Sequence, residues 1–284
     1  MAGNFVHQVG GHTTAKTSLK AQNGHILKPY QSNRRGERER NFYERVFTLE
    51  TESPEFAALR RFLPMYYGST VIAEAGDNKD EMASTSAHDG EYLVLEDLTW
   101  GRQWPCIMDI KMGTRSYEDG ASLEKSSYEK SKSSLQEIAG FRIQGIKRLD
   151  PKEKRYVELD KYFGRSITSM DELPRALGRF FPLENKAKTV KLLEAFLQSL
   201  DQLKTWFDEQ QTTMFIASSF LFLYDGEESP HEGKPVSEAY AADIRLIDFA
   251  HVSHPASPQL DDGLRTGIAT LIQCFQTLLR ESQA

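Results

Sequence analysis

The order in which strand and helix patterns occur constrains the fold of this chain more than any other feature. Short apolar and alternating segments dominate roughly the first 130 of the 284 residues, and amphipathic helical patterns dominate the later part. Strands collected ahead of helices are typical of an α+β architecture. A polar connector begins after Leu98, between two strand patterns. We therefore predict an α+β fold with two lobes: residues 1–98 form a β-rich N-lobe and residues 99–284 form an α/β C-lobe.

The N-terminal part contains four strand patterns and two helical patterns. Apolar residues recur at helical spacing over residues 35–49, and Pro54 is typical of the first turn of a second helix that ends near Pro64. The strands that we predict here are residues 5–9, 25–30, 65–74 and 91–98.

The C-terminal part combines strands with longer helices. The strand patterns at residues 214–224 and 244–249 are separated by a polar loop, and we expect these two strands to pair. The other predicted strands are residues 105–112 and 140–149, and the predicted helices are residues 122–138, 169–181, 186–209 and 260–281.

Composition excludes several classes of protein. An apolar content of 39% is enough for a packed core. The longest mostly apolar run, residues 214–224, is about half the length of a bilayer-spanning helix, so we predict no transmembrane segment. The N-terminus lacks the basic and apolar regions of a secretory signal. Only Cys106 and Cys274 are present, which excludes a disulfide framework and a cysteine zinc cluster and predicts a reducing location, in the nucleus or the cytoplasm.

Charge is distributed in blocks along a chain whose net charge is −6. Residues 1–48 carry a net charge of +5 and residues 111–155 carry +4, while the segments between and after them are acidic. Basic blocks in an acidic chain indicate a local site for an anion. They do not indicate a surface for nucleic acid, so no nucleic-acid partner is expected.

The segment Pro105–Gly113, PCIMDIKMG, places two opposite charges in an apolar strand. Asp109 and Lys111 are two residues apart, so on a strand they project from the same face. Charges in such surroundings are solvated, paired or used in a cleft. A buried Asp–Lys pair and a functional cleft both remain open from spacing alone. Gly113 would let the backbone turn or approach a ligand closely.

Two further segments carry polar groups in apolar strands. Asp248 follows Leu246-Ile247 and precedes Phe249, and a lone carboxylate at a strand end suits Mg²⁺, which takes one or two carboxylates plus phosphate oxygens. An aspartate that caps a turn would look the same. Ser218 and Ser219 interrupt the strand expected to pair with it, where a hydroxyl could contact a metal or satisfy the backbone.

Together these segments resemble the inositol polyphosphate kinase family, in which P-x-x-x-D-x-K-x-G precedes an S-S-[LF]-L strand and then I-D-F. The multikinases are the most similar branch, with a short form of the loop at residues 226–242. Membership implies a protein-kinase-like fold that binds ATP between its lobes. Supporting stretches are HQVGGH at 7–12, ILKP at 26–29, GRSIT at 164–168, LKTWFDEQ at 203–210 and LIDFAHV at 246–252.

The resemblance implies roles for individual residues in binding ATP and Mg²⁺. Lys28 matches the phosphate-binding lysine and Glu39 the carboxylate that orients it, the Lys–Glu arrangement of kinases. Asp248, helped by Ser219, would hold Mg²⁺ against the phosphates. The remaining nucleotide contacts that it implies are backbone groups of Glu96 and Leu98 on the adenine, Ile26 and Ile247 on either side of the base, and Asp109 on the ribose hydroxyls.

The same resemblance implies a substrate site in the second basic block. Lys111 and His251 would face the inositol phosphate, and residues 114–138 would form its binding segment. Three more lysines would contribute, namely Lys125, Lys132 and Lys147. Where multikinases commonly have a Gln pair, this chain has Tyr128 and Glu129, which bears on the preferred hydroxyl.

The implied activity is ATP- and Mg²⁺-dependent phosphorylation of ring hydroxyls of inositol tris- and tetrakisphosphates towards the pentakisphosphate, with Lys28, Lys111 and Asp248 as catalytic residues. Phosphorylation of lipid head groups is known in the family, so the resemblance also allows phosphatidylinositol bisphosphate as a substrate and a transient contact with phosphoinositides. The protein is expected to act as a monomer.

Two alternatives stay open. The stretch Met112–Arg115 has some likeness to inositol hexakisphosphate kinases, which make pyrophosphates. The short separation of 26 residues between Gly113 and Gly140 fits that branch and the multikinases equally. A non-catalytic scaffold that binds phosphoinositides would be expected to lack a metal or phosphate ligand.

Overall fold

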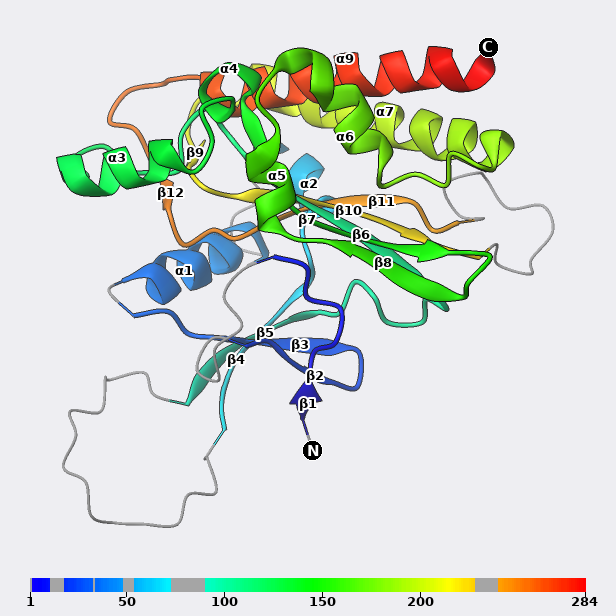
Figure 1. The fold of residues 1–284 in the computed structure, drawn as a ribbon. Coiled ribbons are helices and arrows are strands. Elements are labelled where there is room, and N and C mark those ends of the chain that lie inside the picture. Colours follow the sequence, from blue (N-terminus) through cyan, green and yellow to red (C-terminus); the bar gives the residue numbers. More distant parts are fainter. Residues whose placement is uncertain (1, 11–17, 33, 48–53, 73–89, 228–239) are drawn as a thin grey trace.

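Two antiparallel sheets, each with its own helices, make up the molecule (Figure 1). A computed structural model of the chain describes residues 2–10, 18–32, 34–47, 54–72, 90–227 and 240–284. The predicted two-lobed α+β, kinase-like fold is confirmed. One strand ends at Glu96 and the next begins at Pro105, so the connector after Leu98 lies between the sheets. This supports a division of the chain near residue 98, which we retain as a proposal.

The N-lobe sheet has the strand order β1-β2-β3-β5-β4 among the described residues. Asn23 and Gly24 form the two-residue turn between β2 and β3, with φ of 50° and 78°, as the twist of such hairpins requires. The elements of this lobe are β1 (Gly3–Asn4), β2 (Lys20–Gln22), β3 (His25–Pro29), α1 (Arg35–Phe47), α2 (Pro54–Arg60), β4 (Tyr66–Val71) and β5 (Glu91–Glu96).

The C-lobe sheet has the order β11-β10-β6-β7-β8, and all its neighbouring strands are antiparallel. Its strands are β6 (Pro105–Met112), β7 (Phe141–Asp150), β8 (Arg155–Leu159), β10 (Ser219–Asp225) and β11 (Asp243–Ile247), and a separate pair is formed by β9 (Met214–Phe215) and β12 (Val252–Ser253). The helices are α3 (Leu123–Ser131), α4 (Gln136–Ala139), α5 (Lys161–Ser166), the 3₁₀ turn η1 (Met170–Glu172), α6 (Leu173–Gly178), α7 (Lys186–Glu209) and α9 (Asp262–Gln283).

Helices α7 and α9 pack against each other on one side of the C-lobe sheet, and α1 with the N-lobe sheet lies on the other (Figure 1). An aromatic cluster joins these helices to the strands: Phe196 and Phe275 contact Phe222 of β10 with ring centroids 5.4 and 5.6 Å apart. Edge-to-face packing of this kind adds to the burial of apolar surface. The opposite face of the sheet is turned toward α1 and the N-lobe (Figure 1).

Both cysteines are free and buried in this core. Cys106 is fully buried on β6 and Cys274 is 5% exposed on α9. Burial raises the pKa of both thiols, that of Cys274 to about 11. Neither is a reactive thiolate at neutral pH.

Several predicted elements differ from the observed ones. The predicted helix 122–138 is two helices, because Lys132 ends α3 and a turn precedes α4. The predicted strand 214–224 is interrupted by Ala217, whose φ is 57°. Residues 5–9 do not form the predicted strand, and the strand nearest to them in the sequence is Gly3–Asn4. The predicted helix 169–181 forms only η1 and α6. Strand β8 and helix α5 were not predicted.

Residues 5–10 contact the C-lobe sheet although we predicted them in the N-lobe. The Lys147 Nζ donates to the Val6 carbonyl at 3.0 Å, and a Cβ on Gly145 would lie 2.3 Å from the Val9 carbonyl oxygen. Glycine at position 145 therefore lets this segment approach β7 closely. Gly11 and His12 of the HQVGGH stretch lie outside the described residues.

Candidate functional site

Three charged side chains from distant parts of the chain meet between the lobes. The Nζ of Lys28, on β3, donates to Glu39 Oε1 on α1 at 2.7 Å and to Asp248 Oδ1 at 2.6 Å. Glu39 is 1% exposed, and its Oε1 also accepts the Phe249 N–H at 3.2 Å. Burial alone would lower the pKa of Lys28, but the two carboxylates outweigh it and raise that pKa. The cluster joins the N-lobe sheet, its first helix and the end of β11.

Asp248 is held in an unusual backbone conformation directly after β11. Its φ is 68°, in the left-handed region that non-glycine residues rarely adopt. The Ser218 hydroxyl donates to its carbonyl at 2.9 Å, and the buried ring of Phe249 packs 4.2 Å from that of Phe42. These contacts turn the carboxylate, whose side chain is 43% exposed, out of the core. Lys28 outweighs burial and holds the pKa of Asp248 below its ordinary value.

Asp109, on β6, is a buried carboxylate with one unsatisfied oxygen. The residue is 7% exposed, and its Oδ1 contacts no hydrogen-bond donor among the described residues. Burial and the neighbouring charge of Asp248 raise its pKa to about 6, although a hydrogen bond from Ser219 opposes the shift. A Cβ on Gly10 would lie 2.0 Å from its Oδ2, so a larger residue at position 10 would force the Asp109 carboxylate to move. An orphaned acceptor of this kind suits a ligand hydroxyl.

Side chains that share one face of the C-lobe sheet form a row next to this cluster. Ile247 lies opposite Ser219, Ser219 opposite Lys111, and Lys111 opposite Arg142 on four adjacent strands. Directly opposed residues of an antiparallel sheet project from the same face. Burial lowers the pKa of Lys111, against the opposing charges of Asp248 and Asp109. Asp109 and Lys111 are therefore beside Asp248 and are not a closed pair in the core.

The predicted adenine contacts lie at the connector between the sheets. The Glu96 N–H donates to the Met65 carbonyl at 2.9 Å, so it belongs to the N-lobe hydrogen bonding. The Leu98 carbonyl accepts from Arg102 Nε at 2.9 Å, and within the described residues its N–H has no acceptor. Ile26 is buried on β3, and Ile247 is half-buried at the end of β11.

The predicted substrate residues divide into two groups. His251 Nδ1 lies 2.5 Å from Glu118 Oε1, and Arg38 donates to the same oxygen at 2.6 Å. Burial lowers the pKa of His251, although Glu118 acts in the other direction. Lys125 is exposed on α3, and Lys132 ends that helix, where it pairs with Glu129 and lies over the Tyr128 ring.

Lys147 is the predicted site residue that the structure places apart. It lies opposite Ile107, four residues along β6 from Lys111, and its Nζ is 3.1 Å from Glu158 Oε1. The Lys147 Nζ also lies over the Tyr156 ring and donates to Val6. Through these contacts the ammonium group of Lys147 is already paired, on the side of β7 that faces residues 5–10.

Sequence reasoning missed Glu118, Arg38 and Arg142. Glu118 and Arg38 lie in charge-rich segments, where nothing local distinguishes them from solvated surface residues. Arg142 offered a signal, because a cation near the start of a largely apolar strand needs a partner.

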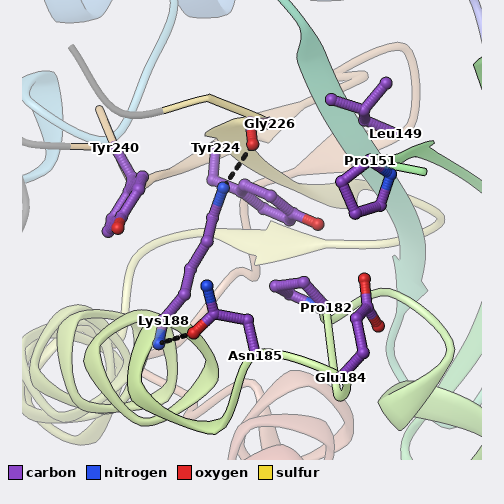
Figure 2. A pocket seen from close by; sticks show the side chains of 9 residues that line it. All are labelled: Leu149, Pro151, Pro182, Glu184, Asn185, Lys188, Tyr224, Gly226 and Tyr240. Atoms are coloured by element: carbon purple, nitrogen blue, oxygen red, sulfur yellow. Dashed lines mark hydrogen bonds between the residues drawn. The ribbon is translucent and has the colours of Figure 1, made fainter. Parts of the chain in front are cut away.

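Two cavities of the C-lobe lie away from the Lys28–Glu39–Asp248 cluster, and the second is lined by part of the predicted substrate segment. One of about 220 Å³ is shown in Figure 2, where Lys188 donates to the Gly226 carbonyl and Asn185 caps α7; Leu149, Pro151, Pro182, Glu184, Tyr224 and Tyr240 complete its lining. Another, of about 240 Å³, lies between residues 114–117 and the helices α3 and α4. Neither is lined by Lys28, Asp109 or Asp248.

Neither a preformed metal cage nor a membrane-spanning helix occurs among the described residues. Within them, no three His, Cys, Asp or Glu side chains converge as a preformed metal cage. Asp248 alone would still suit Mg²⁺, since this ion takes few protein ligands when phosphate oxygens complete its shell. In the same part of the chain, no helix has the length and apolar character needed to cross a bilayer.

The fold and the Lys28–Glu39–Asp248 cluster define a two-lobed, kinase-like protein. The inositol polyphosphate kinase family matches residues 92–276, well over half of the chain. The chain belongs to that family.

Individual relatives agree with this assignment. The chain is 33% identical over 274 residues to the inositol polyphosphate multikinase of Homo sapiens, covering 92% of this chain and 62% of that relative. It is 28% identical over 291 residues to inositol polyphosphate multikinase beta of Arabidopsis thaliana, covering 96% and 92% respectively. It is similar to the solved inositol phosphate multikinase of S. cerevisiae in complex with ADP and Mn²⁺, with a TM-score of 0.68 and 25% identity, covering 90% of this chain and 100% of that one. The chain thus spans less than two thirds of the length of the human relative.

Proposed function

We propose that this chain is an ATP- and Mg²⁺-dependent kinase that phosphorylates ring hydroxyls of inositol polyphosphates, with tris- and tetrakisphosphates as substrates on the way to the pentakisphosphate. The observation that carries the proposal is the convergence of Lys28, Glu39 and Asp248 beside Lys111 in a member of this family. Phosphatidylinositol bisphosphate, which presents a related headgroup, is a further candidate substrate. The proposal includes action as a monomer in the nucleus or cytoplasm, and the two free thiols fit such a reducing location.

The nucleotide would lie between the lobes. Lys28 would bind its phosphates while Glu39 orients the ammonium, and the unsatisfied Oδ1 of Asp109 would accept a ribose hydroxyl. The Leu98 N–H would donate to the adenine, with the apolar side chains of Ile26 and Ile247 beside the ring. The yeast relative was solved in complex with ADP and Mn²⁺, which supports the use of a nucleotide and a divalent metal by this chain.

Asp248 would be the principal ligand of Mg²⁺, which when bound would neutralise charge on the β- and γ-phosphates. The half-exposed carboxylate and the Lys28 ammonium beside it fit this role. Ser219 contributes a hydroxyl that the structure directs to Asp109, so its contribution to the metal site remains a prediction.

The inositol phosphate would bind over Lys111, His251, Lys125 and Lys132. We leave Lys147 out of this set because Glu158 and the Val6 carbonyl occupy it. Transfer of a γ-phosphoryl group has a loose transition state, so positioning and charge neutralisation by Lys28 and Lys111 would supply most of the catalysis. The carboxylates of Glu39, Asp109 and Asp248 already have proposed roles in orienting Lys28, binding the ribose and holding Mg²⁺. We therefore assign none of them as a general base.

Substitution of Asp248 or Lys111 tests the proposal. Asp248→Asn and Lys111→Ala should each lower turnover at least about 100-fold, since a stabilising charge at the reacting group contributes about 3–4 kcal/mol. Lys152→Ala is a matched control, because Lys152 is exposed in the turn between β7 and β8, outside the predicted binding segment. Circular dichroism melts would show that the variants are folded, and near-wild-type turnover in either variant would contradict the assignment.

The alternatives are separated by the products. Chromatography of a panel of inositol phosphates should show new ring phosphates on tris- and tetrakisphosphates. Pyrophosphate formation on the hexakisphosphate would identify the chain with the other branch. No turnover of any member, with phosphoinositide binding retained, would favour the scaffold.

A further inference from the structure

Arg142, at the start of β7, is a buried cation that the nucleotide site does not use. The residue is 5% exposed, and its Nε and Nη1 are buried without an acceptor among the described residues. A buried N–H of a charged group that lacks a partner is costly, by more than a neutral group in the same place. An ordered water, an ion or a ligand can supply the missing acceptor to such a group.

A second guanidinium lies close to the first. Burial lowers the pKa of Arg142, and the charge of Arg165 on α5 lowers it further. The Arg165 Nε is also buried without an acceptor in the described part of the chain. Gly164 makes this approach possible, because α5 packs so tightly on β7 that a Cβ there would lie 1.9 Å from the Ile143 carbonyl oxygen. The charge of Arg165 thus acts on Arg142 across this contact, while the Arg165 guanidinium also lies over the Tyr162 ring, 5.4 Å from its centroid.

The surrounding acidic residues do not neutralise this pair. The carboxylate whose charge acts on Arg142 belongs to Glu129 of α3, and Glu129 already pairs with Lys132. A neighbouring amide, Gln144 at the bulge in β7, adds one more buried N–H without an acceptor in the described chain. Unpaired donors and net positive charge in one place are the features of an anion site.

The location relates this anion site to the proposed reaction. Arg142 lies directly opposite Lys111, and such opposed residues have Cα atoms about 4.5–5.5 Å apart. Ser219 lies on the other side of Lys111, toward Asp248. A substrate whose hydroxyl reaches Lys111 would therefore have the rest of its ring available to Arg142.

We infer that Arg142 and Arg165 form a subsite for a phosphate group that the substrate already carries, beyond the hydroxyl that is phosphorylated. Planar guanidinium groups present several N–H donors in a geometry that matches phosphate oxygens. The subsite makes Arg142 a determinant of specificity for highly phosphorylated rings. This inference rests on the proposed function for the identity of the anion as an inositol phosphate.

Binding measurements in the absence of ATP test the subsite directly. Isothermal titration with inositol 1,3,4,5-tetrakisphosphate should show affinity at least tenfold weaker for Arg142→Leu and for Arg165→Leu, because a hydrogen bond to a charged group contributes about that factor or more. Arg142→Lys keeps the positive charge but not the planar guanidinium, so it should lose less affinity than Arg142→Leu. The melting temperature of Arg142→Leu should be equal to or above that of the wild type, since an unpaired buried charge is removed.

Arg148→Leu is the control on the same strand. Its Nε is likewise buried without an acceptor in the described chain, but its guanidinium donates to the Leu149 carbonyl at 3.2 Å and lies 4.0 Å from Glu184. Because Arg148 is away from Lys111, binding should not change. A loss smaller than tenfold in folded Arg142→Leu and Arg165→Leu would overturn the subsite. Wild-type turnover is a separate readout: its absence would refute the proposed kinase activity, while the titrations would still decide whether these arginines bind the polyphosphate.

Discussion

At the scale of single residues, Asp109 combines two properties that are usually kept apart. It is buried, and it keeps one oxygen without a donor in the described protein. A surface aspartate would have water at that oxygen, and a structural aspartate would have a protein donor. The free-energy cost of burying the ionised carboxylate is seen in its pKa, which burial raises to about 6.

Asp109→Asn should therefore stabilise the ligand-free protein at neutral pH. A carboxyl whose pKa is raised from 3.8 to about 6 binds its proton more tightly in the folded state, so stability falls as pH rises between these values. Above pH 6 the full penalty of about 2–3 kcal/mol is present, and below about pH 4 it is absent. Urea unfolding of both proteins at pH 7.5 and 4 measures the difference. Equal stability of the variant and wild type at pH 7.5 would show that Asp109 is solvated in the native state.

Glu39 offers a second test at this scale. It accepts from both Lys28 and the Phe249 N–H, so it positions the cation and the residue after Asp248 together. Glu39→Gln should lower turnover at least tenfold and unfolding free energy by about 1–3 kcal/mol, since it weakens buried hydrogen bonds to a charged group. Glu37→Gln, an exposed change on the same helix, should alter neither quantity in steady-state kinetics and urea unfolding. If the two variants behave alike, Glu39 is not needed to orient Lys28.

At the scale of elements, the tight contact between α5 and β7 decides where Arg165 lies. The Gly164→Ala Cβ would meet the Ile143 backbone oxygen, which cannot move as a flexible side chain could. We expect Gly164→Ala to lower the free energy of unfolding by about 1–3 kcal/mol or more, as at other overpacked sites. Gly178→Ala is the control, since its Cβ would approach only the ends of the Leu278 and Leu183 side chains, at 3.3 and 3.7 Å. That change should be neutral or stabilise α6 by up to about 1 kcal/mol. Thermal melts that reverse this order would place α5 further from the sheet.

Elements also show what could be predicted from sequence. Strands such as β6 and β10 and helices such as α7 were predicted because their apolar periodicity is local. The register between strands was not predictable, because the bulge that pairs Ile110 with Ile143 but Asp109 with Gly145 depends on both strands. That register sets Arg142, and not Lys147, opposite Lys111. The motifs therefore indicated Lys28, Asp109 and Asp248, while the far wall of the site required the assembled sheet.

At the scale of the whole molecule, the lobes are joined both by aromatic packing, as between Phe42 of α1 and Phe249, and by opposite charges. Lys28 of the N-lobe reaches Asp248, and Arg38 of α1 reaches Glu118 of the C-lobe. The second pair is partly exposed and contributes little to stability by itself. A ligand that binds both lobes should therefore add substantially to the stability of the arrangement in which the lobes are in contact.

ATP with Mg²⁺ should accordingly stabilise the protein. At a nucleotide concentration 100 times its Kd, mass action predicts about 2.7 kcal/mol, seen as a rise of several degrees in the melting temperature. The shift should be much smaller with EDTA present or in Asp248→Asn. Scanning fluorimetry provides the measurement. An unchanged melting temperature for the wild type would favour the phosphoinositide-binding scaffold.

The burial of both thiols has a practical consequence for following motion between the lobes. Maleimide or methanethiosulfonate reagents should leave Cys106 and Cys274 untouched in the native protein, so no background mutations are required. One cysteine could be introduced at the exposed Tyr67 of β4 and another at the exposed Leu123 of α3. Spin labels or fluorophores on that pair would report the separation of the two halves in real time, as each reactant is added.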